Sequence, residues 1–133
     1  MSVGLLLITH RPLAADLLCI ATEILGGRPA DVEVLEVVND TPREMLVAEG
    51  LHMAERLDQG DGVLVLTDLF GSTPANVATA LSLRHPHMRV VSGVNLPVLL
   101  RALNYASLDL DAVTEKALQG GRDGVRLCEA ERD

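Results

Sequence analysis

The sequence predicts a three-layer α/β/α sandwich with a mostly parallel sheet and a short C-terminal edge strand. Short apolar runs alternate with longer amphipathic stretches along the 133 residues, which is typical of a parallel sheet covered by helices on both faces. The length is that of one domain, so we expect residues 1–133 to share a single core. Hydrophobic residues make up 48% of the chain and charged residues 23%, a composition that argues against intrinsic disorder.

Each expected strand is a short apolar run, and each expected helix carries apolar residues at helical spacing. The runs predict strands at residues 3–9, 32–38, 62–67 and 88–91, with a short last strand at 125–128. The spacing predicts helices at residues 12–25, 42 to about 60, 74–83, 96–105 and 110–118. Prolines suit the starts of the first three helices, and the glycine pairs at 26–27 and 120–121 are typical helix ends.

The composition argues against several classes of function. A formal net charge of −8 and a pI near 4.8 argue against nucleic acid or an anionic membrane as partner, since both need a basic face. No apolar run approaches the roughly 18 residues of a membrane span, and the N-terminus lacks a basic leader, so we expect a soluble, cytoplasmic protein.

Cys19 and Cys128 form no metal or redox motif and are expected to be reduced core thiols. We expect His52, His85 and His87 on the surface.

Candidate functional residues lie where the predicted strands end. In an open α/β sheet, ligands bind at the carboxyl ends of the strands, near the point where the strand order reverses. His10 ends the first strand and Asp68 ends the third, so their side chains meet if these strands are neighbours. A carboxylate on one imidazole nitrogen would fix the tautomer and leave the other nitrogen as a nucleophile. A helix-capping histidine and an N-capping aspartate are the simpler structural interpretations.

The turn after the third strand adds another piece. Gly71-Ser72-Thr73-Pro74-Ala75-Asn76 leads into a predicted helix, so free backbone N–H groups and the positive helix end face one cleft. Such an arrangement holds a phosphate or another anion without a lysine or a metal. A histidine oriented by a carboxylate beside this anion cradle indicates a transient phosphohistidine.

Other proteins with this architecture fit the residues less well. A response-regulator receiver needs an acidic cluster after the first strand and a late lysine, whereas the only lysine, Lys116, lies within a predicted helix. A flavodoxin-like protein needs a Ser/Thr-rich loop after the first strand and stacking aromatics, which this sequence lacks. A metal site on His10 and Asp68 has no convincing further ligands.

Three segments, in this order and spacing, resemble a known family: Thr9-His10, then Leu66-Thr67-Asp68-Leu69-Phe70-Gly71-Ser72-Thr73-Pro74-Ala75-Asn76, then Val91-Ser92-Gly93-Val94-Asn95-Leu96-Pro97. They are similar to the mannose-family IIA component of the bacterial phosphoenolpyruvate-dependent sugar phosphotransferase system, over about residues 3–105. The resemblance implies an α/β sandwich, usually a homodimer that exchanges a C-terminal strand between subunits. Residues 125–128 are the candidate for that strand.

The resemblance also implies a phosphotransferase activity in sugar transport. His10 would take a phosphoryl group from the phosphohistidine of the carrier HPr and pass it to a IIB component or a regulatory target. Asp68 would orient the histidine, while Gly71, Ser72 and Thr73 would bind the phosphate, Thr73 through its hydroxyl. The arrangement implies no metal, no cofactor, no nucleic acid and no insertion into a membrane.

Two departures from the family pattern bear on the site and its role. The family often has glycine after the histidine, whereas this chain has Arg11-Pro12; Arg11 would pair with the incoming phosphate or remain a solvated side chain. The chain stops at Asp133 without a fused IIB domain, so we expect the acceptor on another chain, and a stand-alone chain favours regulation over uptake. The alternative function is a non-catalytic regulatory binding module of the same fold. The sequence identifies no sugar.

Overall fold

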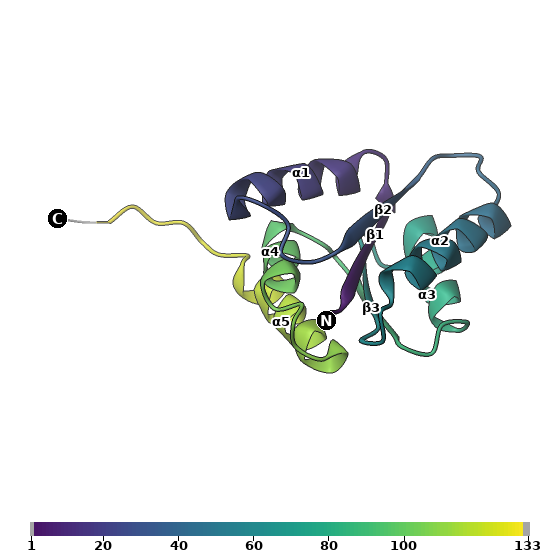
Figure 1. Cartoon of the computed structure of the whole chain (residues 1–133). Coiled ribbons are helices and arrows are strands. Elements are labelled where there is room, and N and C mark those ends of the chain that lie inside the picture. Colours follow the sequence, from purple (N-terminus) through teal and green to yellow (C-terminus); the bar gives the residue numbers. More distant parts are fainter. Residues whose placement is uncertain (1, 132–133) are drawn as a thin grey trace.

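The computed structural model describes residues 2–131, which form an α/β fold of alternating strands and helices (Figure 1). The strands are β1 (Gly4–His10), β2 (Val32–Val37), β3 (Val63–Thr67) and β4 (Met88–Ser92). The helices are α1 (Leu13–Leu25), α2 (Arg43–Leu57), α3 (Thr73–Ser82), α4 (Leu96–Asn104) and α5 (Leu110–Asp123). These bounds confirm the predicted order of the first four strands and of the five helices. None of the helices in this part of the chain is long and apolar enough to cross a membrane.

The sheet has the order β2-β1-β3-β4, and each neighbouring pair is parallel. The chain moves outward in one direction from β1 to β2 and in the other from β3 to β4, so the strand order reverses between β1 and β3. Ile8 of β1 lies opposite Leu35 of β2 and Thr67 of β3. This register brings the ends of the two central strands together, and ligands bind at such a switch point.

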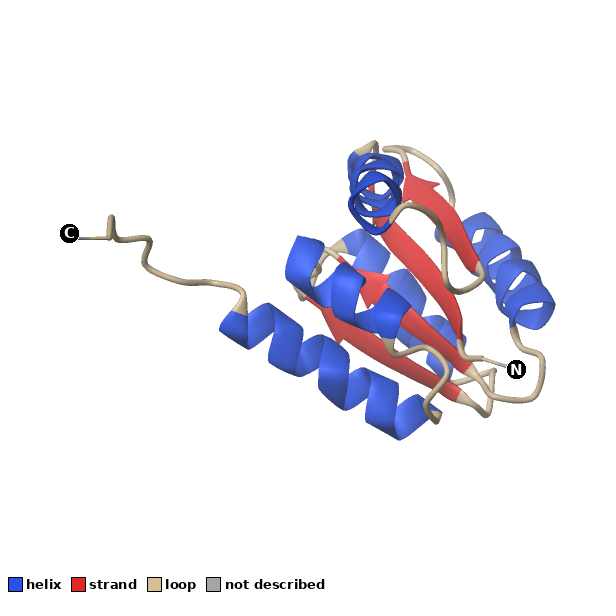
Figure 2. Ribbon diagram, turned by 60° about the vertical axis from the view of Figure 1, so that its left-hand side comes forward, coloured by secondary structure: helices blue, strands red, loops and turns tan. Residues whose placement is uncertain are grey.

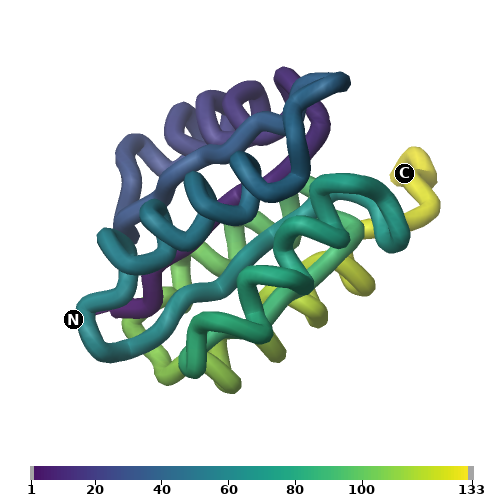
Figure 3. The backbone as a smooth tube through the Cα atoms, turned by 90° about the vertical axis from the view of Figure 1, so that its right-hand side faces the viewer, coloured from purple at the N-terminus to yellow at the C-terminus, as the bar shows by residue number. Residues whose placement is uncertain are grey.

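Helices cover both faces of the sheet, which confirms the three layers (Figure 2). Alternate residues of β1 point to opposite faces, because side chains alternate along a strand. Leu5 and Leu7 pack in a core with α1, α4 and α5, and Leu6 and Ile8 pack in a second core with α2 and α3. Figure 3 shows α2 and α3 side by side on this second face. Because β1 and β3 are covered on both faces, both read as continuous apolar runs.

The glycine pair at 120–121 does not end the last helix, contrary to the prediction. Helix α5 continues through both residues to Asp123. A Cβ on Gly120 would lie 2.7 Å from the Pro97 carbonyl oxygen, and one on Gly121 would lie 2.7 Å from Val98 Cγ2. These glycines therefore permit a close approach of α5 to α4. Gly26 does end α1 as predicted, with the left-handed φ of 72° that favours glycine.

The predicted strand at 125–128 is absent from the described chain. After α5 the backbone runs away from the sheet without secondary structure and is exposed from residue 125 to residue 131 (Figure 1). The cysteine prediction is also wrong, because Cys19 and Cys128 are both exposed rather than in the core. Cys19 lies on α1, on the side of the helix away from its buried residues.

Candidate active site

The structure brings His10 and Asp68 together at the carboxyl ends of the two central strands. His10 Nδ1 lies 2.7 Å from Asp68 Oδ2, and the backbone N–H of His10 donates to the same oxygen at 3.0 Å. The imidazole is 51% exposed, whereas the carboxylate is only 11% exposed. Asp68 thus holds both the backbone and the ring of His10. The Nε2 atom is not used in this pair.

The environment of Asp68 keeps its carboxyl group ionised. Burial alone would raise the pKa of the Asp68 carboxyl, but hydrogen bonds from the backbone and ring of His10 and the charge of that ring lower it. The net pKa lies below the ordinary value of an aspartate. An ionised carboxylate accepts hydrogen bonds only, so Nδ1 of His10 is the nitrogen that donates to it. In the tautomer with its proton on Nδ1, the free electron pair lies on Nε2.

A buried threonine positions His10 at the end of its strand. The Thr9 hydroxyl donates to the His10 carbonyl at 2.9 Å and accepts from the Ala14 N–H at 2.9 Å. It therefore joins the end of β1 to the first turn of α1. The Arg11 N–H donates to the Val37 carbonyl at 3.2 Å, so the chain stays bonded to β2 beyond the histidine. These bonds hold the backbone of His10 on both sides.

The turn between β3 and α3 is closed by its own hydrogen bonds. The Asp68 carboxylate accepts from the Leu69 N–H at 3.0 Å, and the Leu69 carbonyl accepts from both the N–H and the hydroxyl of Ser72, at 3.1 and 2.6 Å. Gly71 has a φ of 84°, a conformation that glycine adopts without strain. Ser72 precedes α3 but makes no side-chain cap bond to it. Both hydrogen-bond donors of Ser72 are thus engaged in shaping the turn.

The remaining predicted residues lie at the same edge of the sheet. Thr73 is the first residue of α3 and is exposed beside the turn. Arg11 is exposed and directly follows His10. Leu69 and Phe70 form the tip of the turn and are 63% and 87% exposed. The site is therefore an open surface with an apolar projection, and not a closed pocket.

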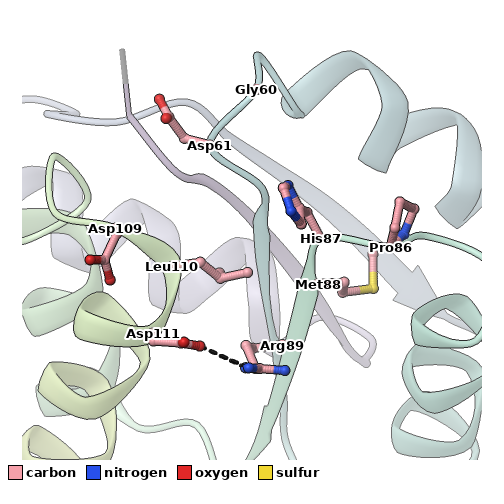
Figure 4. A pocket seen from close by; sticks show the side chains of 9 residues that line it. All are labelled: Gly60, Asp61, Pro86, His87, Met88, Arg89, Asp109, Leu110 and Asp111. Atoms are coloured by element: carbon pink, nitrogen blue, oxygen red, sulfur yellow. Dashed lines mark hydrogen bonds and ion pairs between the residues drawn. The ribbon is translucent and has the colours of Figure 1, made fainter.

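A hollow lies elsewhere, at the opposite end of the sheet (Figure 4). It has a volume of about 520 Å³ and is lined from the amino ends of β3 and β4 and the start of α5. Arg89 and Asp111 form an ion pair at 2.9 Å across it. None of the predicted site residues lines it. Within residues 2–131 no group of three or more candidate ligands is placed to hold a metal ion.

Sequence reasoning missed a second histidine–aspartate pair at this opposite end. His85 Nε2 lies 2.7 Å from Asp58 Oδ2, and the two side chains are only 12% and 17% exposed. Asp58 also accepts from the N–H groups of Gly60 and Gly62. The expected surface position is therefore wrong for His85, whereas His52 and His87 are exposed as predicted. A signal existed in the sequence, because the Asp-x-Gly-x-Gly pattern at 58–62 is typical of a turn closed by an aspartate.

The fold and the site define an α/β domain with an exposed histidine held by a carboxylate next to a helix N-terminus. The comparisons with known proteins specify this class. Residues 4–118 match the family model described as PTS system fructose IIA component. The chain is 31% identical over 132 residues to the mannose-specific EIIAB component of Escherichia coli, covering 98% of this chain but 41% of that protein. This chain therefore spans about two fifths of the length of such EIIAB relatives, although nearly all of this chain takes part in the match.

Solved structures agree with the sequence match. The mannose/sorbose-specific IIA subunit from Enterococcus faecalis is similar with a TM-score of 0.88 and 26% identity, covering 99% of this chain and 98% of that one. A phosphotransferase system component EIIA from Streptococcus agalactiae shares the fold, with a TM-score of 0.80, 23% identity, and coverage of 95% and 96%. The chain belongs to the mannose-type IIA family of the phosphotransferase system.

Proposed function

We propose that this chain is a phosphocarrier that accepts a phosphoryl group on Nε2 of His10 from phospho-HPr. It then passes the group to a IIB component or to a regulatory target. One observation carries the proposal: Asp68 engages Nδ1 at 2.7 Å while the ring stays 51% exposed, so Nε2 is the available nucleophile. Membership of the mannose-type IIA family supports the same assignment.

The transfer is a displacement between two nitrogen atoms. The electron pair of His10 Nε2 attacks the phosphorus, the P–Nε2 bond forms, and the P–N bond of the donor histidine breaks with its electron pair returning to that nitrogen. The proton on Nδ1 stays hydrogen-bonded to Asp68, whose charge stabilises the positive character that the ring gains. The second transfer reverses these roles. Such chemistry needs positioning and charge stabilisation more than covalent help from the protein.

The start of α3 is the proposed cradle for the phosphoryl oxygens. The N–H groups of Thr73 and Ala75 have no acceptor within residues 2–131, as expected in the first turn of a helix, and Pro74 between them has no N–H. These donors and the positive helix end favour an anion. Thr73 adds a hydroxyl, Gly71 permits the turn, and Ser72 contributes mainly by closing it. Arg11 would add a charge from the other side.

A protein fits this site better than a small molecule as the phosphoryl donor. The ring of His10 is 51% exposed on an open surface, where a small molecule would be enclosed on few sides. Exposed apolar side chains instead follow the strand ends around the histidine, among them Leu69 and Phe70 after β3 and Val38 after β2. Exposed aromatic and apolar groups of this kind are typical anchors of protein interfaces. The net charge of −8 would favour a partner with a basic docking surface.

We further propose a homodimer in which residues 125–128 add to a sheet of the partner subunit. Val125 and Leu127 are 77% and 84% exposed and alternate with Arg126, the pattern of a strand with one apolar face. Within residues 2–131 the outer edges of β2 and β4 have no neighbouring strand, and such edges accept further strands. Sedimentation of the whole chain against a variant with Val125 and Leu127 changed to serine tests this. A dimer that becomes a monomer supports exchange, and a monomeric wild type contradicts it.

The proposed function is tested by intact-protein mass after incubation with phosphoenolpyruvate, enzyme I and HPr. We expect one phosphoryl adduct that is labile in acid and stable in base. It should be absent from His10→Ala and retained by His52→Ala, which removes an exposed histidine on α2. No adduct on the wild type, with HPr itself phosphorylated, would exclude the carrier role. The chain would then be a non-catalytic regulatory binding module of the same fold.

A further inference from the structure

The hydroxyl group of Thr67 is buried without a hydrogen-bond partner. Thr67 is the last residue of β3 and is 0% exposed. Within the described residues, the only other buried side-chain oxygen without a partner belongs to Glu36. A buried hydroxyl that makes no bond is less favourable than the methyl group of a valine, which has the same shape. The structure of the unmodified chain therefore gives no reason for threonine at this position.

A comparison with Thr9 makes the difference clear. Thr9 is equally buried and also lies near the end of a central strand. Its hydroxyl makes two hydrogen bonds and joins β1 to the first turn of α1. Thr67 is followed by the turn that leads to α3, yet its hydroxyl bonds to neither the turn nor the helix. Thr9 has a structural role in the unmodified chain that Thr67 lacks.

The register places the Thr67 side chain on the same face of the sheet as His10. Thr67 lies directly opposite Ile8, and His10 is two residues further along the same strand. Residues two apart on a strand share a face, so the side chains of Thr67 and His10 leave the sheet on the same side. That side is covered by α2 and α3, as Figure 3 shows. Pro74 and Ala75 of the first turn of α3 are buried there.

We propose that Thr67 is a positioning residue whose hydroxyl gains its partner only when His10 carries a phosphoryl group. This inference rests on the proposed function. The hydroxyl donates to a phosphoryl oxygen on the side of the sheet that α2 and α3 cover, where the N–H of Ala75 is a further donor. Phosphoryl oxygens are charged acceptors and form the stronger class of hydrogen bond. An interaction made only in the phosphorylated state favours acceptance of the group without stabilising the empty site.

The test compares Thr67→Val with Thr67→Ser and with Thr9→Val as a matched buried control. The stability of the unmodified protein is measured by urea unfolding. The phosphoryl distribution between this chain and HPr is measured by intact mass at equilibrium, and the ³¹P chemical shift reports the surroundings of the group. We expect Thr67→Val to be as stable as the wild type or more so. Its ratio of phosphorylated chain to phospho-HPr should fall about tenfold, as for the loss of one charge-assisted bond. Thr67→Ser should restore both the ratio and the shift.

Three results would overturn the proposal. If Thr67→Val destabilises the unmodified protein as Thr9→Val does, the hydroxyl is already used before phosphorylation. If Thr67→Val leaves the ratio and the ³¹P shift of the wild type unchanged, the hydroxyl does not reach the phosphoryl group, although the carrier function stands. If the wild type itself takes no phosphoryl group from phospho-HPr, both this inference and the proposed function fail.

Discussion

Replacing Asp68 by asparagine tests the hydrogen-bond arrangement on which the site depends. The carboxylate accepts from the backbone and ring of His10 through Oδ2, and from the Leu69 N–H through Oδ1. An asparagine has one acceptor oxygen and one NH₂ group that can only donate. If the oxygen faces His10, the NH₂ meets the Leu69 N–H. If the NH₂ faces His10, the ring must turn its free electron pair to Nδ1 and its proton to Nε2.

Either arrangement weakens the nucleophile, and the loss can be estimated. A hydrogen bond to a charged group contributes about 1.5–3 kcal/mol. Because 1.36 kcal/mol corresponds to a tenfold change in rate, the transfer from phospho-HPr should slow by roughly 10- to 100-fold. The side chain is 11% exposed, so water replaces little of the lost interaction.

The assay is single-turnover transfer from phospho-HPr, followed by rapid acid-free quenching and intact mass. Urea unfolding of the unmodified variant shows whether a slower rate has a folding cause. A rate within threefold of the wild type, in a variant of unchanged stability, would refute the role of Asp68 as the group that orients His10. If the transfer rate falls only as far as the variant is unfolded, Asp68 instead has a purely structural role.

Three further predictions concern the surface, the helix packing and the response to pH. Phe70→Ser should change the free energy of unfolding by no more than about 0.5 kcal/mol, since the side chain is 87% exposed. It should raise the KM for phospho-HPr about fivefold or more in steady-state transfer. An unchanged KM would mean that the donor docks elsewhere on the surface. Gly120→Ala should lower the free energy of unfolding by about 1–3 kcal/mol in urea, because its Cβ would lie 2.7 Å from the Pro97 carbonyl oxygen. If the variant is as stable as the wild type, α4 and α5 can move apart without cost. Burial raises the pKa of Asp58, but hydrogen bonds from Gly60, His85 and Gly62 outweigh it and lower the pKa below its ordinary value. Asp58 thus stabilises the fold above the unfolded-state pKa, near 4, and this contribution disappears as the pH falls through the lower folded-state pKa. Asp58→Asn should therefore be less stable than the wild type at neutral pH and lose less stability between about pH 5 and 2. If the unfolding free energies of the variant and the wild type fall in parallel over this pH range, the prediction is wrong.

The parts of the fold that depend on local pattern could be predicted from the sequence. Continuous apolar runs predicted the central strands because both faces of β1 and β3 are covered. The pairing of His10 with Asp68 was predictable because parallel strands deliver their carboxyl ends to one edge of the sheet. Gly26 could be predicted as the end of a helix because the left-handed φ that it adopts is a local property of the backbone.

Features that depend on tertiary contact were not predictable in the same way. Gly120 looked like a helix end, but it is there because α4 passes too close for a side chain, and that contact is not local. The burial of His85 depends on Asp58, which lies 27 residues away. Cys19 lies between apolar residues in the sequence, yet it faces away from the buried side of α1. Within the described residues the segment 125–128 pairs with no strand, so alternation alone could not establish its pairing.

The central claim is that Asp68 holds Nδ1 of His10 and leaves Nε2 to carry the phosphoryl group. NMR of the ¹⁵N-histidine-labelled chain after incubation with phosphoenolpyruvate, enzyme I and HPr measures this directly, since ³¹P–¹⁵N coupling identifies the bonded nitrogen. We expect coupling to Nε2 of His10 and a proton retained on Nδ1. Coupling to Nδ1, or to another histidine such as His87, would contradict it.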